Sequence, residues 1–194
     1  MKSTLRTGTI PGTVLDAERL HGVTGEEFID KIFYVTDRIM LSQIREITGI
    51  DGTTLQNWVK RGWVDSPSKK TYSKEQLARI LLINMMRDTL QLSHIMSLLK
   101  YMEGNDDEGK ISECSLYDCV CKVLKAVSGA NGGGINGLDD IIIEELTAFS
   151  DLPTEKKKRI LVGVRIIVVS YYATTMKATA EYMLSAIGVD ETEN

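Results

Sequence analysis

The sequence predicts a mainly α-helical protein in which a helix-turn-helix and a small β-hairpin precede an all-α helical domain. Three observations support this fold class. Apolar residues recur at helical spacing through most of the chain. Two short β-prone pairs, Trp63-Val64 and Thr71-Tyr72, flank a turn-forming stretch, which is typical of a hairpin. Residues 103–110 contain no apolar residue and separate two groups of expected helices.

Residues 1–36 are expected to form an N-terminal arm that ends in one short helix. Glycines and Pro11 interrupt any periodicity before residue 24. Thr24 and Glu27 then have the spacing of a capping box, which predicts a helix that begins near residue 25 and ends near residue 35.

Two short helices are expected at the start of segment 37–102. The first has one apolar face and ends at Gly49. The second is capped by Thr53 or Thr54 and stops at Gly62. Its inner face consists of Leu55, Trp58 and Val59. The pair has the dimensions of a helix-turn-helix.

The hairpin follows, with Trp63-Val64 expected to pair with Thr71-Tyr72. Ser73 is placed to cap the next helix, and Gln76 occupies the capping-box position. That helix is expected to reach about Asp88. The periodic residues of a further helix are Ile95, Leu98, Leu99 and Met102.

The acidic linker 103–110 leads to a helical domain at 111–188 that serves dimerisation or regulation, and residues 189–194 form a tail. Three helices are expected in this domain, over about 112–128, Leu138–Phe149, and from Pro153 to about Ile187. The last helix is a candidate dimerisation element. Its apolar positions are Ile160, Leu161, Val164, Ile167, Val168 and Tyr171. The alternative is a helix buried in a monomeric bundle.

Charge is unevenly distributed along the chain. The protein carries a formal net charge of −4. Residues 38–87 hold nine Lys/Arg and four Asp/Glu, a balance of +5, so the remainder carries −9. One region can therefore attract a polyanion while the other repels it.

Short motifs follow one another in a fixed order over residues 41–102. They are Leu41-Ser42-Gln43-Ile44, Thr48-Gly49-Ile50, Thr54-Leu55, Trp58, Lys60-Arg61-Gly62, Trp63-Val64, Pro67 and Lys70-Thr71-Tyr72-Ser73. In order and spacing they resemble the DNA-binding domain of MerR-type bacterial transcription regulators. The resemblance implies a winged helix-turn-helix, double-stranded DNA as partner, and a homodimer. The chain looks like an uncharacterised bacterial subgroup with its own helical C-terminal domain.

The expected DNA-binding residues lie on the second helix and on the wing. They are Thr53, Thr54, Gln56, Asn57, Lys60, Arg61, Lys69, Lys70 and Tyr72. Gln56 and Asn57 can each pair with an adenine edge, whereas the basic residues suit phosphates. Tyr72 is expected to pack its ring and to offer its hydroxyl to a phosphate. The alternative for Gln56, Asn57 and the lysines is a solvated surface.

Two other functions stay open. MerR-type regulators usually carry Arg-Tyr where this chain has Gln56-Asn57, so the fold could serve as a protein-interaction module. Cys114, Cys119 and Cys121 could sense a metal or a thiol oxidant, although no CxxC spacing is present. No cofactor is implied and no nucleophile-base pattern suggests an enzyme. A cytoplasmic protein is expected, because the N-terminus lacks a signal-peptide pattern and the apolar run 160–169 is too short to span a membrane.

Overall fold

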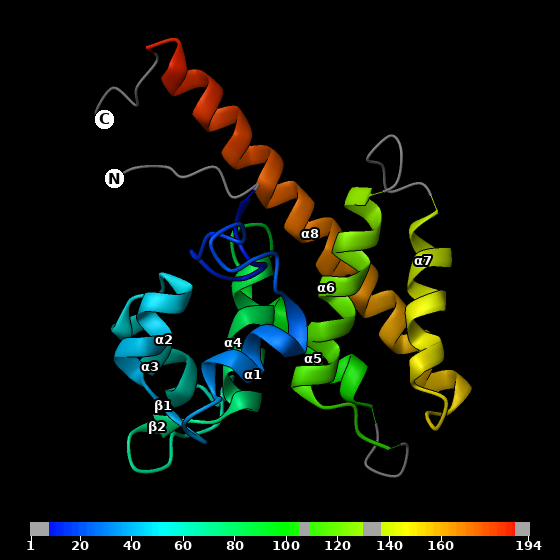
Figure 1. Cartoon of the computed structure of the whole chain (residues 1–194). Helices are drawn as coiled ribbons and strands as arrows, with labels where there is room; N and C mark the ends of the chain where they lie inside the picture. Colours follow the sequence, from blue (N-terminus) through cyan, green and yellow to red (C-terminus); the bar gives the residue numbers. More distant parts are fainter. Residues whose placement is uncertain (1–7, 105–108, 130–136, 189–194) are drawn as a thin grey trace.

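The protein is mainly α-helical, as predicted (Figure 1). The computed structural model describes residues 8–104, 109–129 and 137–188. Its helices are α1 (Gly25–Ile32), α2 (Leu41–Thr48), α3 (Gly52–Lys60), α4 (Lys74–Met86), α5 (Leu92–Glu103), α6 (Glu113–Gly129), α7 (Leu138–Glu145) and α8 (Thr154–Ala186). Two short strands, β1 (Ile39–Met40) and β2 (Thr71–Tyr72), form an antiparallel sheet. A 3₁₀ turn over Leu146–Ala148 follows α7.

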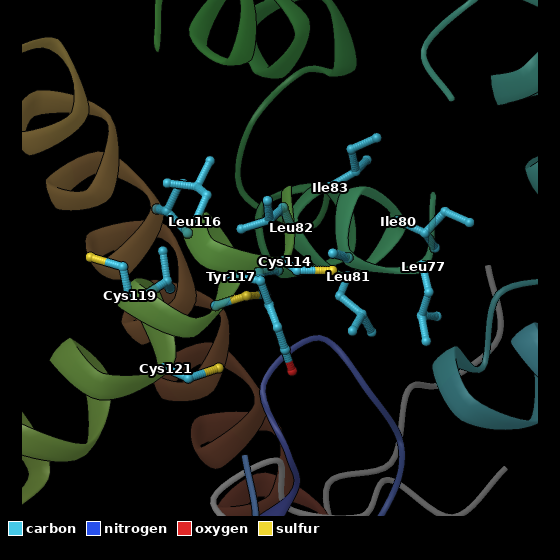
Figure 2. Close-up of a cluster of buried hydrophobic side chains, with 14 of the residues drawn as sticks. Leu77, Ile80, Leu81, Leu82, Ile83, Cys114, Leu116, Tyr117, Cys119 and Cys121 are labelled. Atoms are coloured by element: carbon cyan, nitrogen blue, oxygen red, sulfur yellow. The ribbon is translucent and has the colours of Figure 1, made fainter. Parts of the chain in front are cut away.

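Helix α4 lies at the centre of the core. Its Leu77 and every residue from Ile80 to Met86 are buried, so α4 is covered on nearly all sides. Helices α1, α2, α5, α6 and α8 pack against it, and Figure 2 shows its leucines and isoleucines beside Leu116, Tyr117 and the cysteines of α6. One apolar cluster therefore runs through both segment 37–102 and segment 111–188.

The N-terminal arm is fixed to this core by side chains from later in the chain. The Tyr117 hydroxyl of α6 donates a hydrogen bond to the Pro11 carbonyl at 2.7 Å (Figure 2). The Asn84 amide of α4 donates to the carbonyls of Gly12 and Thr48, at 2.8 and 3.1 Å. These bonds join the arm, α4 and the end of α2 into one unit.

Thr24 is confirmed as the residue that precedes α1, but the expected capping box with Glu27 does not form. Thr24 is the N-cap residue but its side chain makes no capping hydrogen bond. The carboxylate of Asp118 on α6 instead accepts from the Glu26 amide at 3.0 Å. Asp118, 92 residues away in the sequence, therefore accepts the hydrogen bond from a free amide at the start of α1. The capping box of Thr24 and Glu27 does not form.

The expected hairpin is also wrong in its pairing. Strand β2 pairs with β1, with Ile39 opposite Tyr72, so the two strands are separated by α2 and α3 in the sequence. The backbone around Trp63 bonds to α4 instead. Arg79 Nε donates to the Trp63 carbonyl at 2.9 Å, and Gln76 Nε2 donates to the Asp65 carbonyl at 2.7 Å. These side chains occupy acceptors that a second strand would need.

Local capping signals are confirmed elsewhere. The Ser73 amide donates to Gln76 Oε1 at 2.9 Å and the Gln76 amide donates to Ser73 Oγ at 3.4 Å, which completes the capping box of α4. Gly49 ends α2 in the left-handed region with φ 70°. Pro153 precedes α8 as its N-cap residue and is not inside the first turn.

Helices α5 and α8 approach closely at Gly163, so Gly163→Ala should destabilise the protein. A Cβ at Gly163 would collide with the side chain of Met102, which is 1% exposed and would have to shift. Overpacking costs about 1–3 kcal/mol, and alanine recovers about 1 kcal/mol of helix propensity. We expect a net loss of about 1 kcal/mol in the free energy of unfolding, measured by urea denaturation.

Gly129→Ala in α6 is the matched control, because no atom lies within 4 Å of the added Cβ. This variant should be as stable as the wild type or slightly more stable. Equal stability of Gly163→Ala and Gly129→Ala would contradict the close approach.

Candidate nucleic-acid interface

Helix α3 turns one face inward and the other to solvent. Leu55 and Trp58 are each 1% exposed and form the inner face, with Val59 partly buried beside them. The exposed residues are Thr53, Gln56, Asn57 and Lys60. Figure 1 places α2 and α3 together on one side of the molecule, far from α7. The expected base-reading residues are therefore brought together on an open surface.

The cap of α3 is Asp51, and the prediction that Thr53 or Thr54 caps this helix is wrong. Asp51 Oδ1 accepts from the Thr54 amide at 2.9 Å, and Thr54 Oγ1 donates to Asp51 Oδ2 at 2.5 Å. Both bonds lower the pKa of Asp51. Thr53 is consequently a residue of the first helical turn, and the Thr54 hydroxyl is occupied by the cap.

Two basic residues end α3. Lys60 is its last residue and Arg61 is the C-cap, and both are exposed. The Arg61 guanidinium carbon lies 5.0 Å from the centroid of the Trp63 ring, which is a cation–π contact. Trp63 thereby orients Arg61 and does not itself offer a ring for stacking.

The tip of the loop between α3 and β2 is a tight turn over Ser68–Thr71. The two end residues exchange backbone hydrogen bonds, 3.0 Å from the Ser68 amide and 2.9 Å from the Thr71 amide. The central residues Lys69 and Lys70 have φ of 49° and 65°. Positive φ at both positions is the pattern of a type I′ turn, which strongly favours Asn-Gly. The residue types at positions 69 and 70 do not indicate this strained conformation.

Tyr72 lies in the core and is only 3% exposed. Its side chain projects inward from β2, and burial raises the pKa of its hydroxyl. The expected phosphate contact through that hydroxyl has no support, because the side chain does not reach the surface that carries Lys69 and Lys70.

Several basic residues of segment 38–87 already pair with other groups of the protein. Arg38 donates to the Thr71 hydroxyl at 2.9 Å and to the Thr71 carbonyl at 2.7 Å. Lys74 pairs with Asp30 at 2.5 Å, and Arg79 pairs with carboxylates of α5 and α6. The positive surface is therefore smaller than the sequence count implies.

Arg45 of α2 belongs to this surface and was missed as a site residue. It is exposed, and its Cδ lies 3.6 Å from where a Gly52 Cβ would stand, at the start of α3. The signal in the sequence was its place opposite the apolar face of α2, on which Ile44 and Ile47 are buried.

The three cysteines are buried and poorly suited to sensing. Cys114, Cys119 and Cys121 are at most 6% exposed in α6 (Figure 2). Burial raises the pKa of Cys119 and of Cys121 to about 12, and raises that of Cys114 further. Reactive and metal-binding cysteines require the thiolate. No group of metal-ligating side chains occurs among the described residues.

The comparisons with known proteins assign no function. A family described as a domain of unknown function, DUF1836, matches residues 26–120. This match extends from α1 into α6 and so includes α2, α3 and the turn at Ser68–Thr71. The uncharacterized protein YkrK of Bacillus subtilis (strain 168) is 26% identical over 164 residues, covering 77% of this chain and 70% of YkrK. No solved structure matches the chain.

Helix α8 meets the length and composition criteria for a membrane span. Of the helices described, it alone does so, with 33 residues and a mean hydropathy of 1.3 over its most apolar window. In that window 39% of the residues are buried within the protein. The criterion is weak evidence, because long core helices of water-soluble proteins also satisfy it.

Proposed function

We propose that the protein is a cytoplasmic bacterial transcription regulator that binds specific double-stranded DNA as a homodimer. Helices α2 and α3 would form a MerR-like helix-turn-helix, and the loop from Gly62 to Lys70 would form its wing. One observation carries the proposal. Lysine occupies both left-handed positions of the turn at the wing tip, where asparagine and glycine cost less. Strain retained at exposed positions indicates a role for the charge.

The surrounding surface has the composition of a DNA-binding site. Gln56 and Asn57 project from the middle of α3, where each can pair bidentately with adenine in a major groove. The exposed basic residues flank them on α2, at the end of α3 and on the wing. They are Arg45, Lys60, Arg61, Lys69 and Lys70. Such residues hold phosphates and fix the register of the base-reading helix.

Double replacement of Gln56 and Asn57 by alanine tests this assignment. We expect the variant to lose discrimination between its preferred site and random DNA by roughly 1–3 kcal/mol per lost base contact. Its salt dependence should stay unchanged, because the phosphate contacts remain. The preferred site is first obtained by selecting bound fragments from a genomic DNA pool, and affinities are then measured by fluorescence anisotropy.

Gln91→Ala is a suitable control, because this exposed glutamine precedes α5, makes no capping hydrogen bond and is not among the expected DNA-binding residues; it should discriminate as the wild type does. Failure of the wild type to retain any duplex at low salt would overturn the proposal and favour a protein-interaction module on the same fold.

Dimerisation through α8 requires a different face from the one that the sequence suggested. Ile160, Val164, Ile167 and Val168 are fully buried within the monomer, so they cannot meet a second copy. Leu161 and Tyr171 are partly buried against the same core. The C-terminal part of α8 extends beyond the body of the protein, as Figure 1 shows.

A continuous apolar stripe runs along the open face of α8. The spacing between successive members alternates between four and three residues. We call this set of residues the heptad stripe. They are Val162, Ile166, Val169, Ala173, Met176, Ala180, Met183 and Ile187. All are exposed except the half-buried Ile166, and Met176 and Ile187 reach 70% and 74% exposure. Apolar residues sustained at this spacing over more than three heptads are typical of a coiled coil.

Side-chain sizes along the heptad stripe favour an antiparallel pair of α8 helices. An antiparallel register sets Ala173 opposite Met176 of the second copy and Val169 opposite Ala180. Each alanine then meets a larger residue, whereas a parallel pair would stack alanine on alanine and leave space unfilled. The stripe is about 38 Å long at 1.5 Å per residue. We therefore infer a two-fold dimer, which the reading of two DNA half-sites requires.

A further inference from the structure

A cleft of about 930 Å³ lies where the proposed wing meets the C-terminal helices. The loop from Gly62 to Ser68 forms one side, and the first residues of α4 lie behind it. The end of α5 and the starts of α6 and α8 form the other side. Its volume is within the range of small-molecule sites, which is about 300–1,000 Å³.

One wall of this cleft contains a buried hydrogen-bond acceptor that has no donor. Arg79 bridges Glu103 of α5, at 2.7 Å, and Glu113 of α6. Only Oε1 of Glu113 takes part, and its Oε2 is buried without a hydrogen bond. Burial raises the pKa of Glu113, against the effect of the Arg79 guanidinium. An unfilled buried acceptor is costly, so a donor from a ligand would be stabilised there.

The same wall holds a buried cation. Lys156 of α8 is fully buried, and its ammonium donates to the backbone carbonyl of Glu103. Among the described residues, the Glu103 carboxylate acts to raise the pKa of Lys156, but that carboxylate pairs with Arg79. Burial has the larger effect and lowers the pKa of Lys156. Burying a charge costs several kcal/mol, which an anionic group in the cleft would reduce.

The other anion-attracting feature of the cleft is already filled. Helix α6 starts here, and Glu75 Oε2 accepts from the amides of Glu113 and Cys114 at 2.7 and 3.2 Å. This carboxylate satisfies the N-terminus of the helix. Lys156 is therefore the place for a ligand's anionic group, and the exposed Lys110 adds positive charge at the rim.

We propose that this cleft binds a small zwitterion of the amino-acid class, with its carboxylate near Lys156 and its ammonium near Glu113 Oε2. The two groups share one wall, because Glu103 contacts Lys156 through its carbonyl and Arg79 through its carboxylate. Arg79 also holds the opposite wall through the Trp63 carbonyl. Arg79 therefore links the two walls between which an occupant would lie.

Binding in this cleft would affect the turn that carries Lys69 and Lys70. The loop lining the cleft leads directly into that turn, and Gln76 holds it through the carbonyls of Asp65 and Ser66, at 2.7 and 3.3 Å. This part of the inference rests on the proposed function. The zwitterion would then be the effector that changes DNA affinity, while binding itself needs no DNA.

Thermal unfolding in the presence of individual L-amino acids tests the site. We expect at least one at millimolar concentration to raise the Tm in a dose-dependent way, while its N-acetyl and carboxamide derivatives, which each lack one charge, do not. Lys156→Met and Glu113→Gln should each weaken the binding by roughly tenfold or more. Lys158→Met, at an exposed position two residues further along α8, should bind as the wild type.

No shift with any amino acid, or equal shifts in the wild type and Glu113→Gln, would overturn the inference. Glu113→Gln retains the size of the side chain and so remains informative if Lys156→Met does not fold. Binding of an amino acid by a protein that retains no DNA would refute the proposed function and leave the cleft assignment intact.

Discussion

Replacing Met176 and Met183 by glutamate should convert the proposed α8 dimer to monomers. In an α8 pair both methionines lie in the heptad stripe, and each is more than 60% exposed in the single chain. Burial of a methionine contributes about 2 kcal/mol, so four of them contribute about 8 kcal/mol to a dimer. At 1.4 kcal/mol per tenfold, dissociation should be favoured by up to about six orders of magnitude. Sedimentation velocity at micromolar concentration measures the change.

A matched control uses the same end of α8. Tyr182→Glu with Ser185→Glu adds the same two charges at exposed positions outside the heptad stripe. This variant should remain dimeric, and circular dichroism should show equal helix content in both variants. A wild type that is monomeric at tens of micromolar would refute the dimer. Equal dissociation of both variants would refute the assignment of the stripe.

Exchange of Lys69-Lys70 for Asn-Gly should stabilise the protein and weaken its binding to DNA. The new residues suit positive φ at both positions of the turn. After the entropy cost of glycine, a gain of about 1 kcal/mol in the free energy of unfolding is expected. Loss of two phosphate contacts should reduce the slope of log affinity against log salt by about 1.8. Chemical denaturation and salt-dependent anisotropy give the two values.

Two further variants separate the effect of the lysine charges on DNA binding from the effect of backbone strain on stability. Lys69→Ala with Lys70→Ala removes the charges and keeps the positive φ, so it should lose DNA affinity without gaining stability. Lys69→Arg with Lys70→Arg should leave both properties close to those of the wild type. If the Asn-Gly variant binds random duplex as tightly as the wild type at every salt concentration, the wing is not part of the site.

Sequence patterns predicted features whose partners are near in the chain. The capping box of Ser73 and Gln76 closes within four residues, and the stop of α2 at Gly49 depends on one backbone conformation. Two predictions failed because a distant group competed. Asp118 took the place of Thr24 at α1, and the side chains of Arg79 and Gln76 took the backbone acceptors that would have paired with β2. Such competition depends on which elements meet in space.

The candidate site was predicted only in part, because some of its features depend on local sequence and others on contacts between distant elements. Exposure of Gln56 and Asn57 follows from the helical period, because Leu55 and Trp58 must be buried on the other face. The inward placement of Tyr72 depends on the pairing of β1 with β2, which joins residues separated by two helices. Its position could not be read from local composition.

The sequence by itself determined the helical character of the chain, the order of its helices and the inner face of α3. These follow from the spacing of apolar residues, because a helix with an apolar face must bury it. The tertiary structure decided which of two apolar faces of α8 is available to a partner. Ile160, Val164 and Ile167 pack inside, and the heptad stripe stays open. A helix that is apolar on both faces carries no internal signal of which face the core will cover.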